Sequence, residues 1–151
     1  MRVLGIDLGD RRIGLAAGET GSGGARGLTT LPRATATADL GRLRTIVDEQ
    51  HIEAVVIGLP RNTDGSEGPQ AAATRAWAIG VLVPLGLPYV FRDERFTSQD
   101  AEVNLGRAPR GRSGGPPSPA ARERRRRSVD REAARLILQA ELDARAGEAS
   151  R

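Results

Sequence analysis

The chain has 151 residues, of which 38% are hydrophobic, and a formal net charge of +4 at pH 7. It contains no cysteine, which excludes disulfides, thiolate metal sites and a catalytic cysteine. No apolar run reaches the length of a membrane span and no signal peptide precedes the first predicted strand, so we expect a cytoplasmic protein without a membrane partner. The length favours one domain over residues 1–146, followed by a frayed tail at 147–151.

The first predicted elements form a β-hairpin that presents an aspartate. The short apolar run from Val3 to Ile6 predicts a buried strand with Asp7 at its end, and a charged turn leads to a second apolar run over 13–17. Burying a carboxylate on a central strand is costly unless a cation or a proton compensates its charge. Asp7 is therefore predicted to handle a metal or a phosphate, with a solvated turn-capping role as the alternative.

The following elements predict a mixed sheet covered by helices. Residues 26–33 favour a third strand antiparallel to the second, and apolar residues recur at helical spacing over 37–50. The apolar run 54–59 is typical of a central parallel strand, and a helix over about 70–84 precedes a fifth strand at 88–92. This order indicates a ribonuclease-H-like α/β fold: a mixed five-stranded sheet, three antiparallel strands followed by two parallel ones, flanked by helices.

The polar loop 61–69 follows the fourth predicted strand. Parallel α/β sheets usually bind ligands at this edge, so Asn62, Asp64 and Glu67 are candidate substrate contacts. The same residue types are also typical of a simple turn, which is the alternative for this loop.

The last third of the chain is rich in arginine. A short helix is predicted to end at Leu105, a glycine- and proline-rich loop follows over 106–119, and a closing helix begins at either Ser118 or Ser128. All basic residues of the chain are arginines, and Glu123 is the only acid between residues 107 and 127. Guanidinium groups bind phosphates bidentately, so this cluster predicts contact with nucleic acid, although a solvated helix face would have the same composition.

Three acidic residues are predicted to converge in this fold. Asp7 lies on the central strand, Glu94 follows the fifth strand, and Asp130 lies on the closing helix, where Ala133 and Ala134 would permit close approach to the sheet. Carboxylates that share a cleft repel one another unless divalent cations lie between them, and hard oxygen ligands favour Mg²⁺ or Mn²⁺. Two such ions about 4 Å apart would activate water and stabilise the leaving oxygen of a phosphodiester.

The motifs of the chain resemble those of the pre-16S rRNA nuclease family, also described as Holliday-junction-resolvase-like. The similar segments are Gly5-Ile-Asp-Leu-Gly9 with Arg12-Ile-Gly-Leu-Ala16, Val56-Ile-Gly-Leu-Pro60 with Asn62 and Asp64-Gly-Ser-Glu67, Asp93-Glu-Arg95 with Thr97-Ser98, and Val129-Asp130 with Ala133-Ala134 and Leu136-Ile-Leu138. They occur in the same order as in the family and cover nearly the whole chain. The loop 106–119 and the four-arginine run are longer and richer in arginine than the family's basic stretch. This departure bears on which substrate the protein prefers, and not on the metal site.

The resemblance implies a metal-dependent nuclease that matures the 5′ end of 16S rRNA. Its catalytic and metal-binding residues would be Asp7, Glu94 and Asp130, with Mg²⁺ or Mn²⁺ as cofactor and structured RNA as partner. We expect nucleic-acid contacts from Arg12, Arg95, Arg122, Arg124, Arg125, Arg126 and Arg127. The chain is expected to act as a monomer or a weak homodimer.

Three other functions are compatible with parts of the pattern. A Holliday-junction resolvase would apply the same chemistry to DNA and would require a dimer for two symmetric cuts. A non-catalytic RNA-binding assembly factor would use only the basic cluster. An ATP-binding protein of the actin and sugar-kinase type shares a phosphate loop like Gly5-Ile-Asp-Leu-Gly9 but needs two such domains, and this chain has room for one.

Overall fold

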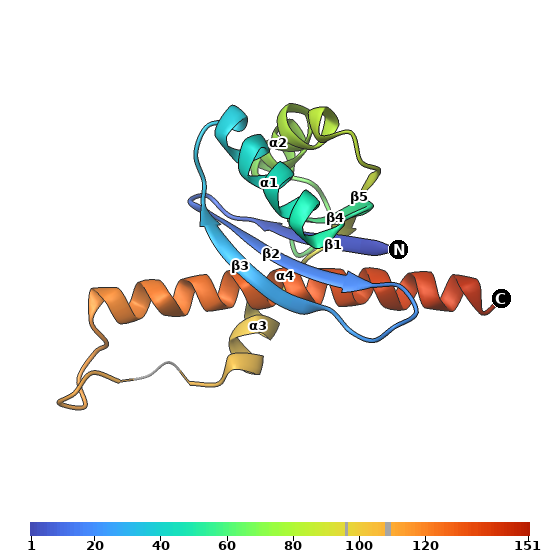
Figure 1. The fold of residues 1–151 in the computed structure, drawn as a ribbon. Coiled ribbons are helices and arrows are strands. Elements are labelled where there is room, and N and C mark those ends of the chain that lie inside the picture. Colours follow the sequence, from blue (N-terminus) through green and yellow to red (C-terminus); the bar gives the residue numbers. More distant parts are fainter. Residues whose placement is uncertain (96, 108–109) are drawn as a thin grey trace.

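The computed structural model describes residues 1–95, 97–107 and 110–151 (Figure 1). Five strands form one sheet in the order β3-β2-β1-β4-β5. Their bounds are β1 (Arg2–Leu8), β2 (Arg12–Glu19), β3 (Arg26–Pro32), β4 (Ala54–Leu59) and β5 (Tyr89–Asp93). The strands β1, β2 and β3 pair antiparallel, whereas β4 pairs parallel with both β1 and β5. The predicted mixed five-stranded sheet is therefore confirmed.

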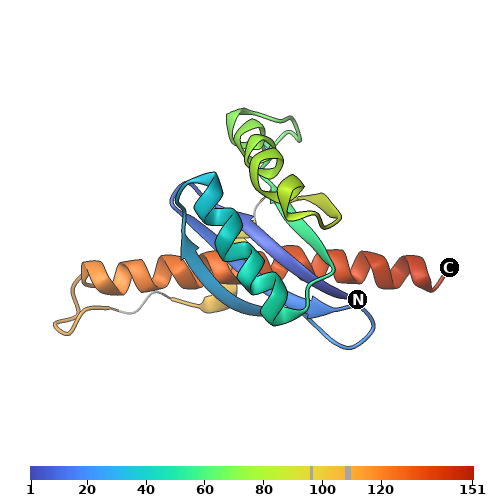
Figure 2. The same cartoon turned by 45° about the horizontal axis from the view of Figure 1, so that its top comes forward.

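Helices cover both faces of the sheet (Figures 1 and 2). One face packs against α1 (Ala36–Gln50) and α2 (Pro69–Leu85), and the other packs against α4 (Pro119–Ala149), which also contacts α3 (Thr97–Leu105). Side chains of a strand alternate between faces, so Leu4 and Ile6 join the core under α1 and α2 while Val3 joins the core under α4. This double covering explains why the run from Val3 to Ile6 in β1 is continuously apolar rather than alternating.

The start of α4 is at the first of the two predicted positions. The Ser118 side chain accepts a hydrogen bond from the Ala121 backbone N–H, and Pro119 occupies the first turn, where its missing N–H costs nothing. The arginine run therefore lies within the helix, which continues through Ala149 into the segment expected as a frayed tail. With 31 residues α4 is roughly 46 Å long, and it extends past both ends of the sheet (Figure 2). None of the helices in the described part of the chain is both long and apolar enough to span a bilayer.

Glycines on three adjacent strands bring α4 unusually close to the sheet. A Cβ added to Gly5 would lie 2.6 Å from Leu138 Cβ, and one added to Gly58 would lie 2.6 Å from Ile137 Cδ1. A Cβ on Gly14 would overlap the backbone carbonyl of Asp130. The sequence predicted this approach from alanines on the helix, and the structure shows that glycines on the strands supply the matching space.

Substituting Gly14 by alanine should displace α4 from the sheet. We expect Gly14→Ala to lower the free energy of unfolding by about 1–3 kcal/mol, because the new methyl group overlaps rigid backbone. The matched control is Gly41→Ala in α1, where an added Cβ meets no atom within 4 Å and should stabilise the helix by about 0.5–1 kcal/mol. Urea unfolding of the two variants measures the difference, and equal stabilities would contradict the close contact.

Candidate active site

The carboxyl ends of β1, β4 and β5 open onto one cavity of about 640 Å³. Asp7 at the end of β1, Glu94 directly after β5 and Asp130 on α4 all line this cavity. Alternation along β1 places Asp7 on the same face as Val3 and Gly5, which is the face that α4 covers. The three predicted acids therefore lie around a single cavity.

Asp7 and Glu94 form a buried carboxyl pair at this cavity. Asp7 is 8% exposed, and the two side chains lie within hydrogen-bonding reach of each other. Burial raises the pKa of Glu94, and the adjacent charge of Asp7 raises it further. Burial also raises the pKa of Asp7, the hydrogen bond with Glu94 opposes that rise, and the charge of Asp130 adds to it. The pair therefore shares a proton near neutral pH and titrates as a unit.

Gly58 makes room for this pair on β4. A Cβ at Gly58 would lie 2.7 Å from the carboxyl carbon of Glu94, so any larger residue would push the glutamate away from Asp7. The backbone N–H of Glu94 donates to the carbonyl of Leu59, which fixes the residue at the end of the sheet. The apolar motif around Gly58 thus positions an acid that lies thirty-six residues further along the chain.

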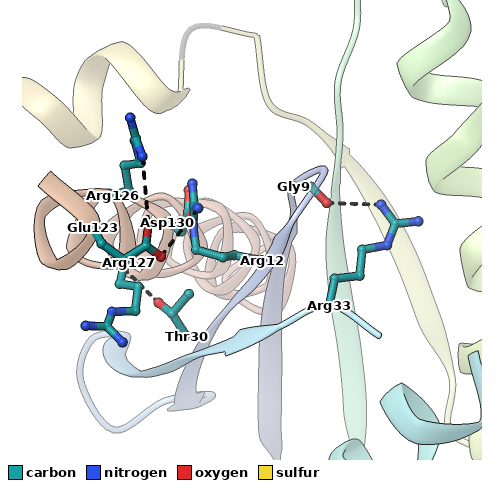
Figure 3. A network of polar contacts seen from close by, with 8 residues as sticks. All are labelled: Gly9, Arg12, Thr30, Arg33, Glu123, Arg126, Arg127 and Asp130. Atoms are coloured by element: carbon teal, nitrogen blue, oxygen red, sulfur yellow. Dashed lines mark hydrogen bonds and ion pairs between the residues drawn. The ribbon is translucent and has the colours of Figure 1, made fainter. Parts of the chain in front are cut away.

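Asp130 lines the same cavity but is paired with an arginine (Figure 3). The Nε of Arg12 donates to Oδ2 of Asp130 at 2.6 Å, and the Nη1 of Arg12 lies 3.6 Å from Oε1 of Glu123. Within residues 1–95, 97–107 and 110–151, no three acidic or histidine side chains are grouped closely enough to hold a metal ion together. Asp7 and Glu94 thus contact each other, whereas Asp130 lines the same cavity but is bonded to Arg12 instead.

The carboxyl pair suits a hard divalent cation. In proteins Mg²⁺ is usually held by one or two carboxylates, with water and substrate phosphate oxygens completing its shell. Burial raises the pKa values of both carboxyl groups, and a cation that replaces their shared proton would compensate the charge that is costly to bury there. Oxygen is the only donor type of this pair, which agrees with the expected preference for Mg²⁺ or Mn²⁺.

The predicted arginines of α4 have different surroundings. Arg122, Arg124, Arg126 and Arg127 are exposed on the helix. Arg126 lies 3.8 Å from Glu123, and Arg122 donates to the backbone carbonyl of Pro117. These exposed guanidinium groups are accessible to the phosphates of a nucleic acid.

Arg125 differs from its neighbours because its guanidinium is engaged within the protein. It donates to backbone carbonyls of Glu102, Leu105 and Gly106 at the carboxyl end of α3. A cation at this end of a helix satisfies free carbonyls and complements the helix dipole. Arg125 therefore holds α3 against α4, a role that the sequence pattern did not distinguish from phosphate binding.

Three arginines line the cavity, and two of them, Arg33 and Arg61, were not singled out from the sequence. Arg33, Arg61 and Arg95 lie there together with the first residues of α2. Arg33 donates to the carbonyl of Gly9 (Figure 3), and Arg95 donates to Asp93 and to the carbonyl of Thr63. Arg95 was a predicted nucleic-acid contact, whereas the position of Arg61 just beyond β4, after Pro60, was the available signal for that residue.

The loop 61–69 forms a compact turn. Asp64 accepts hydrogen bonds from the backbone and side chain of Ser66, which also binds the Asn62 amide, and Glu67 pairs with Arg75. This geometry favours the turn interpretation for Asn62, Asp64 and Glu67. Arg61 and Thr63 of the same loop line the cavity.

Known proteins resemble this chain over nearly its whole length. Residues 1–144 match the family model RuvX, described as Holliday junction resolvase. A protein of Moorella thermoacetica is 41% identical over 143 residues, covering 95% of both chains, and one of Anaeromyxobacter sp. (strain K) is 44% identical over 146 residues, covering 97% of this chain and 99% of that protein. Both relatives bear the name "Putative pre-16S rRNA nuclease".

Solved structures show the same fold at much lower identity. RuvC of T. thermophilus in complex with a Holliday junction substrate is 18% identical with a TM-score of 0.54, covering 97% of this chain and 96% of that one. The Fowlpox virus resolvase bound to Holliday junction DNA is 10% identical with a TM-score of 0.50, covering 95% and 98%. The predicted ribonuclease-H-like fold class is confirmed by this likeness. The family match and the full-length relatives show that the chain belongs to the RuvX family of nucleases.

Proposed function

We propose that this chain is a metal-dependent endonuclease that hydrolyses phosphodiester bonds in structured RNA, at the 5′ side of pre-16S rRNA. The observation that carries the proposal is the buried Asp7–Glu94 pair in a cavity that arginines also line. An acidic pair alone would repel a phosphate, and arginines alone would bind a phosphodiester without hydrolysing it. The two together suit a nuclease. The choice of RNA rests on the name of the full-length relatives.

Each group of the cavity has a part in this reaction. Asp7 and Glu94 would hold Mg²⁺ or Mn²⁺, which when bound activates water and stabilises the leaving oxygen of a phosphodiester. Arg33, Arg61 and Arg95 neutralise the non-bridging oxygens of the strand and orient it across the cavity. The buried position of Asp7 limits access of bulk water to its carboxylate. A two-ion arrangement would require Asp130 as a further ligand.

A junction resolvase is the second candidate, and the description of the matching family model favours it. It would use the same cavity on four-way DNA and would act as a symmetric dimer. The expected monomer or weak homodimer, the cytoplasmic location and the non-catalytic assembly role stay predictions. The substrate comparison below separates the RNA nuclease, the junction resolvase and the assembly factor.

Removing one carboxylate of the pair should abolish cleavage. We expect Asp7→Asn to lower the cleavage rate by more than about 100-fold, because even the outer-shell partners of a metal site contribute 10–100-fold. Labelled 5′ leader of pre-16S rRNA, a four-way DNA junction and unstructured RNA are each incubated with Mg²⁺, Mn²⁺ or chelator. The control is Asp48→Asn, an exposed acid on α1, which should cleave like the wild type.

The same assay also separates the three functions. Full activity of Asp7→Asn, in protein free of contaminating nuclease, would contradict the proposed site. Preference for the DNA junction would favour the resolvase, and binding without cleavage of any substrate by the wild type would favour the assembly factor.

The carboxyl pair should also make stability depend on pH when chelator is present. The pKa values of Asp7 and Glu94 are raised in the folded state, so the native protein binds more protons than the unfolded chain. The contribution of these two groups to the free energy of unfolding therefore falls as the pH rises above about 4.5. Glu94→Gln should therefore be more stable than the wild type at pH 8 by about 1 kcal/mol, or roughly 3 °C in melting temperature, and similar to it at pH 4.

Thermal unfolding at both pH values, with chelator and with Mn²⁺, measures this effect. Mn²⁺ should raise the melting temperature of the wild type at pH 8 and raise that of Glu94→Gln much less, because a cation replaces the shared proton. Glu49→Gln on the exposed side of α1 is the control and should follow the wild type. An equal response of Glu94→Gln to Mn²⁺ would exclude the pair as the cation site.

A further inference from the structure

Arg12 connects the hairpin of Asp7 to two acids of α4. It lies at the start of β2, and its guanidinium contacts Asp130 and Glu123, which are seven residues apart on one side of the helix (Figure 3). The side chains of Arg12 and Asp130 are 21% and 20% exposed, so their ion pair is partly shielded but reachable from solvent. One carboxylate of the cavity is thus neutralised by a residue that does not line the cavity.

Asp130 also lies at the cavity of the carboxyl pair. It lines the same cavity as Asp7 and Glu94, and its backbone packs against Gly14, which pairs with Asp7 across β1 and β2. Its Oδ2 is already the acceptor of the short hydrogen bond from Arg12. Arg12 and a divalent cation therefore compete for the same carboxylate.

The backbone around this ion pair is fixed, so an exchange of partners involves side chains alone. The Asp130 backbone packs against Gly14, and the carbonyl of Arg127 accepts a hydrogen bond of 2.7 Å from Thr30 on β3 (Figure 3). These contacts hold this part of α4 on the sheet whether or not Asp130 keeps its arginine. Glu123 remains as a second partner for Arg12 after Asp130 is released.

We propose that Arg12 holds Asp130 away from the cation only while nucleic acid is absent, and that a phosphate of the bound strand takes over the guanidinium. Arginine binds phosphate and carboxylate with the same bidentate geometry, so a phosphate is a chemically matched replacement. Asp130 then completes the carboxylate set with Asp7 and Glu94. The inference rests on the proposed nuclease function, and it makes Arg12 a positioning residue that couples the binding of nucleic acid to the binding of metal.

This coupling is measurable without activity. Mn²⁺ is titrated calorimetrically into the full chain, with and without an RNA hairpin whose phosphorothioate backbone resists hydrolysis. In the wild type the hairpin should tighten Mn²⁺ binding by about tenfold. Arg12→Gln alone should already bind Mn²⁺ about tenfold more tightly than the wild type, and the hairpin should add little.

Two further variants separate the exchange of partners from a general change of charge and from the loss of any ion pair to α4. In the Asp130→Asn background, Arg12→Gln should change Mn²⁺ affinity by less than about twofold, since the gain acts through Asp130 and not through general charge. Arg92→Gln removes another ion pair to α4, with Glu141, whose carboxylate lies 3.0 Å from the Arg92 guanidinium, and should leave both Mn²⁺ affinity and the hairpin effect unchanged.

Each outcome distinguishes this inference from the proposed function. Unchanged Mn²⁺ affinity in Arg12→Gln, or a gain that persists in the Asp130→Asn background, would overturn the exchange of partners while leaving the nuclease intact. A wild type that binds no Mn²⁺ with or without the hairpin would instead overturn the proposed metal-dependent function. Thermal unfolding of every variant confirms that the titrations compare folded proteins.

Discussion

The contact between the backbone of α4 and the glycines of the sheet is the constraint on which the site depends. Gly5, Gly14 and Gly58 lie on the face that α4 covers, and each faces an atom of the helix that an added methyl group would overlap. Gly14 pairs directly with Asp7 across the two antiparallel strands. The absence of a side chain at this position therefore allows α4 to place Asp130 beside the central carboxylate.

Burial on this face determines the electrostatics of the cavity. Asp7 is enclosed because its side chain points toward the layer that α4 covers, and Glu94 is enclosed because Gly58 gives it space. Burial raises the pKa values of both carboxyl groups, and the adjacent charge of Asp7 raises the pKa of Glu94 further. Asp130 is instead paired with the guanidinium of Arg12.

The arginines of the chain divide into groups with different tasks. Arg12 and Arg125 are engaged with other parts of the protein, one with acids of α4 and the other with the carbonyls that end α3. Arg33, Arg61 and Arg95 line the cavity. Further exposed arginines lie near the start of α4, the helix that also carries Asp130. An extended polyanion fits such a distribution better than a small ligand does.

Much of the fold was predictable because it follows from local patterns. The apolar runs gave the five strands, and helical spacing gave the helices, with boundaries close to those of the structure. The start of α4 was ambiguous because Ser118 and Ser128 are equally good caps in isolation. In the structure the earlier start is used, where the Ser118 cap forms and Arg125 bonds to the carbonyls at the end of α3.

The sequence by itself determined the order of the elements and the identity of three acids around one cavity, because strand ends and helix faces follow from residue spacing. Only the tertiary structure decided which acids meet. Asp7 and Glu94 form the buried pair, whereas Asp130 binds an arginine 118 residues earlier in the chain. Such a partner depends on where a side chain of β2 and a turn of α4 come together in space, and no local pattern in the sequence encodes that distance.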